Sequence, residues 1–276
     1  MSKPNWPCYS DEEIQAVSNV LCSGQVNYWT GQEGRFFEKE FASYIGTRHA
    51  IAVSNGTVAI ELCLRALGIG VDDEVIVTSR TFLASASAIV MCGATPVFAD
   101  VDPISQNISL DTIEEKISSK SKAIICVHLS GWPCDMPEIM AYAQKNNLYV
   151  VEDCAQAHGA SIDGMKVGSW GHMAAFSFCQ DKIMSTGGEG GMITTNDEVL
   201  WKKSWSYKDH GKSYDAVHNK KHAPGFRWLH ETFGSNYRMT EMQAAIGRIQ
   251  LKNLDESVAV RIKNARMYSD FFSTYE

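Results

Sequence analysis

A regular alternation of apolar and helical segments between residues 49 and 151 constrains the fold most strongly. Five apolar segments have the length and composition of buried strands, at residues 49–53, 74–78, 95–100, 123–129 and 148–151. Segments with helical spacing separate them, at residues 58–70, 83–92, 110–117 and 137–146. This order predicts crossover connections and a mostly parallel, buried sheet. The expected fold class is therefore α/β, an α/β/α sandwich.

The flanking sequence adds helices and two more strands. Residues 10–22 begin with Ser10 as a helix cap, and residues 35–46 form a second amphipathic pattern that ends in glycine. Further on, strands are expected at 174–178 and 192–195, and helices at 197–207, 239–254 and 258–272. Residues 208–231 are polar and irregular, which predicts a long loop such as a lid or substrate-binding segment.

Composition excludes several classes of function. The 276 residues carry a net charge of −7, which argues against nucleic acid as the main partner. No apolar run approaches the roughly 20 residues of a membrane span, and the N-terminus lacks the apolar centre of a signal peptide. Eight cysteines occur without a C-x-x-C pair, so no metal site is expected. We expect a cytoplasmic protein with free thiols.

Residues 148–192 carry the clearest chemical signal. One apolar strand ends in Glu152 and Asp153, and a second is followed by Lys182 and four glycines, at 187, 188, 190 and 191. In a parallel sheet such positions meet beyond the carboxyl ends of the strands. A lysine can form an imine with a carbonyl cofactor, and a carboxylate can keep a basic ring nitrogen protonated. An ordinary loop acid and a surface lysine remain the alternative interpretation.

Other strand ends offer supporting side chains. Gly56 and Thr57 lie where a strand turns into a helix, and a helix N-terminus favours an anion, although the same residues also make an ordinary helix cap. Phe82 is either a core aromatic or a ring-stacking face. Gln156 lies three residues after Asp153 and is placed to reach the same ring, whereas Ser177 alone would be a core serine.

Together these motifs resemble the DegT/StrS-type sugar-nucleotide aminotransferases, which belong to the fold-type I pyridoxal-phosphate enzymes. The matching residues follow the family's order along nearly the whole chain: residues 54–57, Thr81 and Phe82, 127–129 with Gly131 and Pro133, 152–159, 176–178, Lys182, 188–191, and 236–239 with Glu241, Ala244 and Ala245. Cys179 and an additional Gly187 depart from the family pattern and are interpreted as subfamily variation. The resemblance implies the large domain of a fold-type I PLP-transferase.

The resemblance also implies roles for individual residues. Lys182 would form the imine with pyridoxal 5'-phosphate and then move the proton as the catalytic base. Asp153 would pair with the ring nitrogen, and Phe82 would stack on the ring. Gln156 would lie on the other side of the ring or at its hydroxyl.

The phosphate and the partner subunit complete the implied site. Gly56, Thr57 and Ser177 would hold the phosphate. Asn236 would reach the phosphate bound by the neighbouring subunit, so a homodimer with shared active sites is implied. The implied reaction moves an amino group, usually from glutamate, to a nucleotide-linked keto sugar. Its setting would be amino-sugar biosynthesis for a cell-surface polysaccharide or a glycosylated metabolite.

Four alternatives stand beside this interpretation, and the sequence argues against two of them. A sister group with histidine in place of the lysine removes a sugar hydroxyl, and Lys182 argues against it. An aminotransferase acting on a cyclitol or an aromatic precursor, or a non-catalytic regulatory relative, is also possible. A nicotinamide domain is disfavoured because no G-x-G-x-x-G follows the first strand. We expect an N-terminal segment (1–34), a cofactor-binding domain (35–255) and the start of a truncated small domain (256–276).

Overall fold

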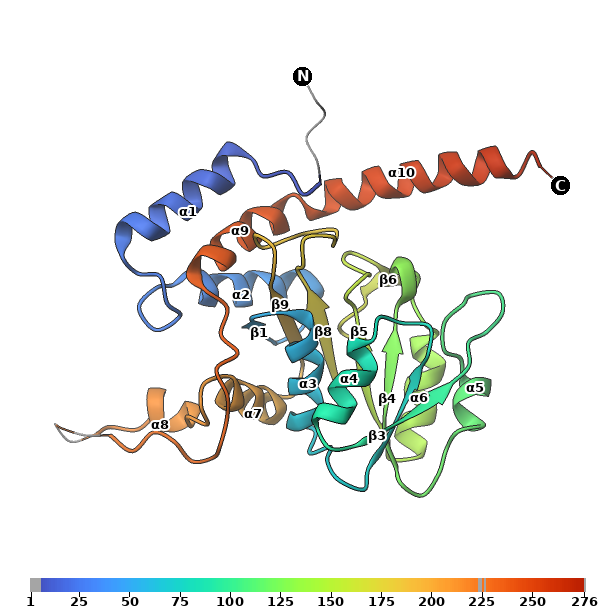
Figure 1. Cartoon of the computed structure of the whole chain (residues 1–276), viewed down its shortest axis with the longest axis horizontal. Helices are drawn as coiled ribbons and strands as arrows, with labels where there is room; N and C mark the ends of the chain where they lie inside the picture. Colours follow the sequence, from blue (N-terminus) through green and yellow to red (C-terminus); the bar gives the residue numbers. More distant parts are fainter. Residues whose placement is uncertain (1–5, 223–224, 226, 276) are drawn as a thin grey trace.

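A seven-stranded sheet forms the centre of the protein (Figure 1). The computed structural model describes residues 6–222, 225 and 227–275. The strands lie in the order β1-β9-β8-β5-β4-β2-β3. Among these seven strands, β9 runs in the direction opposite to the other six. The bounds are β1 (His49–Val53), β2 (Glu74–Thr78), β3 (Thr95–Ala99), β4 (Ser121–Val127), β5 (Tyr149–Asp153), β8 (Met173–Ser177) and β9 (Gly191–Thr195).

Helices cover both faces of the sheet, and the two-residue period of the strands separates the layers. Val75 and Val77 of β2 pack with α3 (Gly56–Ala66) and α4 (Ala84–Met91), together with α7 (Glu198–Lys208). Ile76 points to the opposite face, where α5 (Leu110–Glu114) and α6 (Met136–Lys145) lie. On that face α2 (Glu33–Ile45) and α9 (Glu241–Lys252) cover β1, β8 and β9. The predicted α/β/α sandwich with a mostly parallel sheet is confirmed.

The N-terminal helices are joined to α9 by side-chain contacts. Helix α1 (Asp11–Ser23) begins with the predicted cap at Ser10, whose side chain accepts from the Glu13 amide. The buried carboxylate of Glu241 accepts the amides of Glu33 at 2.5 Å and Gly34 at 3.2 Å, so it caps α2 from another part of the chain. Helix α10 (Leu254–Phe272) then projects beyond the sheet (Figure 1).

Short elements differ from the expectation. The predicted loop at 208–231 contains the five-residue helix α8 (Tyr214–His218), while residues 223, 224 and 226 lie outside the described residues. A hairpin of β6 (Ser161–Ile162) and β7 (Met165–Lys166) and the 3-10 turn η1 (Leu129–Gly131) were not predicted. β6, β7 and η1 have only two or three residues each, too few to show a hydrophobic period, and α8 lies within a polar segment. The hairpin does carry a turn signal, Asp163 and Gly164, both with positive φ.

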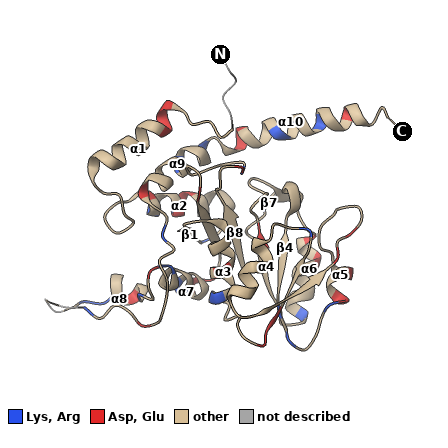
Figure 2. Ribbon diagram, viewed as in Figure 1, with Lys and Arg blue, Asp and Glu red and all other residues tan. Residues whose placement is uncertain are grey.

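Charged residues are spread over the periphery of the fold. Figure 2 shows Lys and Arg interspersed with Asp and Glu on the outer helices and loops, while the central strands are mostly uncharged. Within the described residues, no helix combines the length and the apolarity that a membrane crossing requires. Charged side chains at the ends of the central strands therefore stand out as candidates for a site.

Candidate active site

A cavity of about 600 Å³ lies between the carboxyl ends of β5 and β8 and the start of α3. This is the edge at which α/β sheets bind ligands. Seven of the eight residues predicted from the sequence line this cavity: Gly56, Thr57, Phe82, Asp153, Gln156, Ser177 and Lys182. The structure therefore brings together side chains from segments far apart in the sequence.

The first turn of α3 and the end of β8 touch each other at one end of the cavity. Asn55 caps α3, and its Oδ1 atom accepts the Val58 amide at 3.0 Å. A Cβ atom on Gly56 would lie 2.6 Å from the Cβ of Ser177, and one on Gly191 would lie 2.4 Å from the Asn55 carbonyl oxygen. Glycine at both positions lets the helix start lie directly against the strands, where its free amides favour an anion.

Asp153 is the last residue of β5 and lies almost fully buried. Its Oδ2 atom accepts the Ser85 hydroxyl at 2.8 Å, and Oδ1 accepts the Ala155 amide at 3.1 Å. Burial raises the pKa of Asp153, while these two hydrogen bonds oppose that rise. A buried carboxylate that faces a cavity is suited to a cationic ligand group.

Lys182 follows β8 on a tight loop that returns to β9. Its side chain is 19% exposed, and Nζ lies 3.5 Å from Oδ2 of the exposed Asp181. The loop is closed by a hydrogen bond from the Gln180 amide to the Gly188 carbonyl, and Gly187 and Gly188 both have positive φ. The additional Gly187 thus occupies a backbone conformation that favours glycine, and the loop keeps the Lys182 side chain on the cavity wall.

Phe82 and Gln156 form other parts of the wall. The Phe82 ring is 74% exposed although it is apolar, so it offers an open aromatic face to a ligand. The Oε1 atom of Gln156 accepts the Ser130 amide at 2.7 Å, which fixes the orientation of the side chain. Its Nε2 group has no hydrogen-bond partner among the described residues and remains available as a donor.

Asn236 lies outside this cavity. It pairs with Asp209 in an isolated antiparallel bridge, and the next residues attach the segment to β1. The Tyr237 carbonyl accepts the Ser54 amide at 2.9 Å, and Arg238 binds the buried Asp209 carboxylate at 2.8 Å. Within its own chain Asn236 is therefore held in a segment that hydrogen-bonds to the end of β1, but it does not line the cavity.

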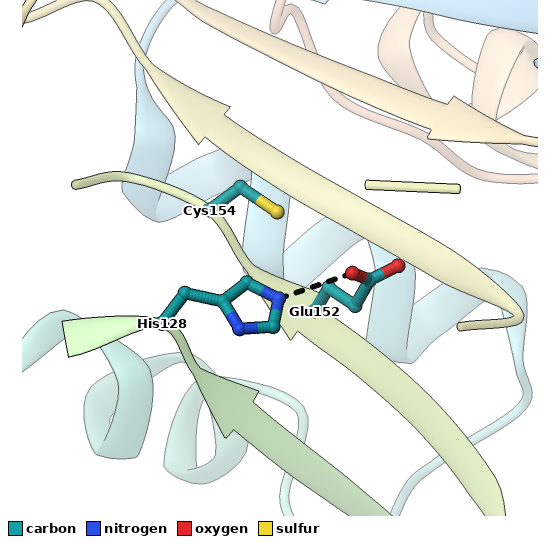
Figure 3. Close-up of side chains that lie close together, drawn as sticks. All are labelled: His128, Glu152 and Cys154. Atoms are coloured by element: carbon teal, nitrogen blue, oxygen red, sulfur yellow. Dashed lines mark hydrogen bonds and ion pairs between the residues drawn. The ribbon is translucent and has the colours of Figure 1, made fainter. Parts of the chain in front are cut away.

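The acid beside Asp153 has a different environment, shown in Figure 3. Glu152 points to the opposite face of β5, where Oε2 accepts Nε2 of His128 at 3.0 Å and the Gly168 amide at 2.8 Å. Its Oε1 atom accepts the amides of Trp170 and Gly171 at 2.8 and 2.7 Å. Glu152 thus ties β4, β5 and the segment before β8 together.

Figure 3 also shows Cys154 beside this pair, and the three side chains resemble a set of metal ligands. Their hydrogen bonds argue against that function. All four acceptor positions of the Glu152 carboxylate are used, and Nδ1 of His128 already accepts the Cys134 amide at 3.1 Å. Burial raises the pKa of the Cys154 thiol to about 12, so the thiolate that binds metals is disfavoured. The cluster is structural.

Several further residues line the cavity and were not assigned there from the sequence. Ser85 contacts Asp153 directly, and Cys179, Asp181 and Glu189 lie around Lys182. Ser85 gave no signal because a serine near the start of an apolar helix is an ordinary residue there. The proximity of Asp181 and Glu189 to the glycine cluster was visible in the sequence, but their side-chain direction was not.

A mostly parallel sheet, a helix start suited to an anion, and a lysine and an acid on the wall of one cavity are features of the pyridoxal-phosphate-binding α/β enzymes. The chain belongs to the DegT/DnrJ/EryC1/StrS aminotransferase family, whose family model matches residues 7–276. The family predicted from the sequence motifs is confirmed, and with it the prediction of an aminotransferase.

Known relatives agree with this membership. GDP-perosamine synthase from Escherichia coli O157:H7 is 43% identical over 265 residues, which cover 95% of this chain and 69% of the relative. The solved aminotransferase from Psychrobacter cryohalolentis is 60% identical with a TM-score of 0.97, over 99% of this chain and 69% of that one. The chain thus spans about two thirds of the length of these relatives.

The residues present fit the family's cofactor. A solved relative from Bacillus subtilis with bound cofactor PMP is 33% identical with a TM-score of 0.78, over 94% of this chain and 57% of that one. In the present structure the α3 amides, Thr57 and Ser177 are suited to hold a phosphate. Gly56 has no side chain, so nothing at this position fills the space between the start of α3 and Ser177. Asp153 suits a protonated ring nitrogen, and Lys182 offers the amine that a carbonyl group needs. The cofactor of the family is pyridoxal 5'-phosphate, as predicted.

Proposed function

We propose that this protein transfers an amino group from glutamate to a keto sugar linked to a nucleoside diphosphate. One observation carries the proposal: Lys182 and Asp153 line the same cavity as the helix start at Gly56 and Thr57. A phosphate site, an acid for a ring nitrogen and an amine are the three protein groups that this cofactor chemistry requires. The product would enter amino-sugar biosynthesis for a polysaccharide or a glycosylated metabolite.

Each residue has a defined task in this proposal. When bound, pyridoxal phosphate supplies the carbonyl group and the electron-withdrawing ring for amino transfer. The α3 amides, Thr57 and Ser177 hold its phosphate, and Asp153 keeps its ring nitrogen protonated. Phe82 covers one ring face, and Gln156 donates from Nε2 to the ring hydroxyl or the other face. Lys182 would bind the cofactor's carbonyl group, and its free amine would carry the proton between the substrate carbon that bears nitrogen and the former carbonyl carbon of the cofactor.

A lysine at position 182 favours amino transfer over removal of a sugar hydroxyl. After release, a primary amine is both a base and a group that can recapture the cofactor carbonyl, whereas a histidine can act only as a base. The location of Asn236 outside its own cavity supports a homodimer in which it serves the partner's phosphate. We place the reaction in the cytoplasm, where nucleotide-linked sugars and free thiols are both available.

Covalent labelling tests the cofactor part of the proposal. Protein incubated with pyridoxal phosphate and then reduced with borohydride should carry one stable adduct at Lys182, located by peptide mapping. Lys182→Ala should remove the adduct, and Lys202→Ala, at a surface lysine paired with Asp215, should keep it. An adduct that persists in Lys182→Ala at another lysine would exclude the assignment.

A direct assay tests the reaction itself. The protein loaded with pyridoxal phosphate should form more than one equivalent of 2-oxoglutarate per active site from glutamate only when a nucleotide-linked keto sugar is added. A panel of GDP-, UDP- and dTDP-linked 3-keto and 4-keto sugars then identifies the acceptor. The protein could also form the adduct at Lys182 and yet show no turnover of glutamate with any acceptor, a cyclitol ketone included. That result would instead support a non-catalytic relative.

A further inference from the structure

Two hydroxyl groups lie in a row behind the Asp153 carboxylate. The Ser85 hydroxyl donates to Oδ2 of Asp153 at 2.8 Å, and Oγ1 of Thr81 lies 2.8 Å from the Ser85 hydroxyl oxygen. Ser85 is 1% exposed and Asp153 is 5% exposed, so the contact between them is shielded from solvent. Thr81 and Ser85 come from the segment at the start of α4, while Asp153 ends β5.

The direction of both hydrogen bonds follows from the number of protons available. An ionised carboxylate only accepts, so the single hydroxyl proton of Ser85 points at Asp153. Ser85 then has only lone pairs to offer to Thr81, and the Thr81 hydroxyl must be the donor. Both dipoles therefore point toward the negative charge. Such aligned hydroxyls strengthen each other in a buried setting.

Asp153 needs this support because burial disfavours its charge. Burial raises the pKa of Asp153, and the hydrogen bond from Ser85 is the largest of the interactions that oppose this rise. The Ala155 amide and the charge of Lys182 act in the same direction as Ser85. The carboxylate has used only two of its four acceptor positions on Ser85 and Ala155, which leaves capacity for a ligand.

We propose that Ser85, oriented by Thr81, is a positioning residue that keeps the Asp153 carboxylate ionised and directed at the ring nitrogen of the cofactor. This role rests on the proposed function, because it assumes that Asp153 binds that nitrogen. A neutral Asp153 would lose its attraction to the protonated ring nitrogen. Ser85 therefore acts on this nitrogen indirectly, through Asp153. A merely structural serine in α4 would show no such dependence on the ring nitrogen.

The dependence on a single cofactor atom gives the experiment. We would measure Kd for pyridoxal phosphate and for its 1-deaza analogue, which has carbon in place of the ring nitrogen, with the unmodified protein and three variants. Ser85→Ala should weaken binding of pyridoxal phosphate about tenfold, as for loss of one hydrogen bond to a charged group, and should leave the analogue within about twofold. Ser85→Thr keeps a hydroxyl and should restore binding. Ser87→Ala, in the same helix but outside the cavity wall, should change neither Kd.

Each other outcome has a distinct meaning. An equal loss of both ligands in Ser85→Ala, or no loss at all, would overturn the role of Ser85 while leaving the proposed function intact. Failure of the unmodified protein to bind pyridoxal phosphate would overturn the proposed function, and the role of Ser85 with it. If Ser85→Ala does not fold, Thr81→Val provides the same comparison, with a loss of about threefold expected for pyridoxal phosphate alone.

Discussion

Gly56 and Ser177 touch so closely that a Cβ atom on Gly56 would lie 2.6 Å from the Cβ of Ser177. The contact joins the first turn of α3 to the last residue of β8. The neighbouring strand β9 makes a similar approach, because a Cβ on Gly191 would lie 2.4 Å from the Asn55 carbonyl oxygen. Small residues therefore set the distance between the helix amides and the Ser177 hydroxyl in the proposed phosphate site.

A methyl group at Gly56 should disrupt that distance. Gly56→Ala must push α3 away from β8, because the atoms it meets include the Ser177 backbone. We expect pyridoxal phosphate to bind at least about tenfold more weakly, and unfolding by urea to show a loss of about 1–3 kcal/mol. Gly70→Ala is the matched control, because the nearest atom to its Cβ is 3.9 Å away. Unchanged cofactor binding in Gly56→Ala would mean that the phosphate lies elsewhere.

Asn236 permits a test of the shared site by complementation. Lys182→Ala and Asn236→Ala should each be nearly inactive alone, if Asn236 serves the partner's phosphate. When the two variants are co-expressed, random pairing makes half of the dimers mixed. Each mixed dimer then has one site in which both Lys182 and Asn236 are intact. The mixture should therefore recover about a quarter of the unmodified activity. If Asn236 acted within its own chain, no site in a mixed dimer would be intact and no activity would return.

The Glu152 cluster should behave as a structural element without metal. Any zinc that the protein binds should bind equally well in Cys154→Ser. A chelator should leave the urea unfolding curve unchanged. Glu152→Gln should cost about 1–3 kcal/mol, because its amide group would face backbone donors and leave one of them unpaired. Glu256→Gln, at an exposed site on α10, is the control and should be neutral. Cys154-dependent zinc binding would contradict the structural role.

The order of elements was predictable because strands and helices in this chain differ in hydrophobic period. All seven central strands were expected, and β1 and β2 have the predicted bounds. Strand order was not predictable, because period reveals which residues are buried but not which strand lies alongside. The antiparallel pairing of β1 with β9 depends on contacts between distant segments. The pair β6 and β7 was missed because two residues are too few for a period to develop, and the helix α8 was missed because it lies within a polar segment.

The site residues were predictable where a charged residue or a glycine follows an apolar strand pattern. Lys182 and Asp153 stand at the ends of buried strands, and Gly56 stands at a strand-to-helix turn, so each has a visible local signal. Ser85 has none, since its function depends on a contact with a residue on another element. Glu152 and Asp153 are adjacent acids in the sequence, and only the pleat of β5 directs one to the network in Figure 3 and the other to the cavity.

His158 should make the stability of the protein sensitive to mildly acidic pH. Its ring is 2% exposed, and its centre lies 5.6 Å from that of Phe176 and 5.7 Å from that of Phe178. Burial lowers the pKa of His158 to about 4, whereas an unfolded histidine has a pKa of about 6.5.

Between these two pKa values the unfolded chain binds the proton and the folded chain does not, so the free energy of unfolding decreases as pH falls below about 6.5. From pH 7 to pH 5, His158 should account for a loss of about 2 kcal/mol, which urea unfolding at the two pH values can measure. His158→Leu keeps an apolar group among the same rings and should remove that part of the loss, whereas His230→Asn, at an exposed histidine, should not. Equal losses in the unmodified protein and His158→Leu would mean that the folded protein accommodates the proton.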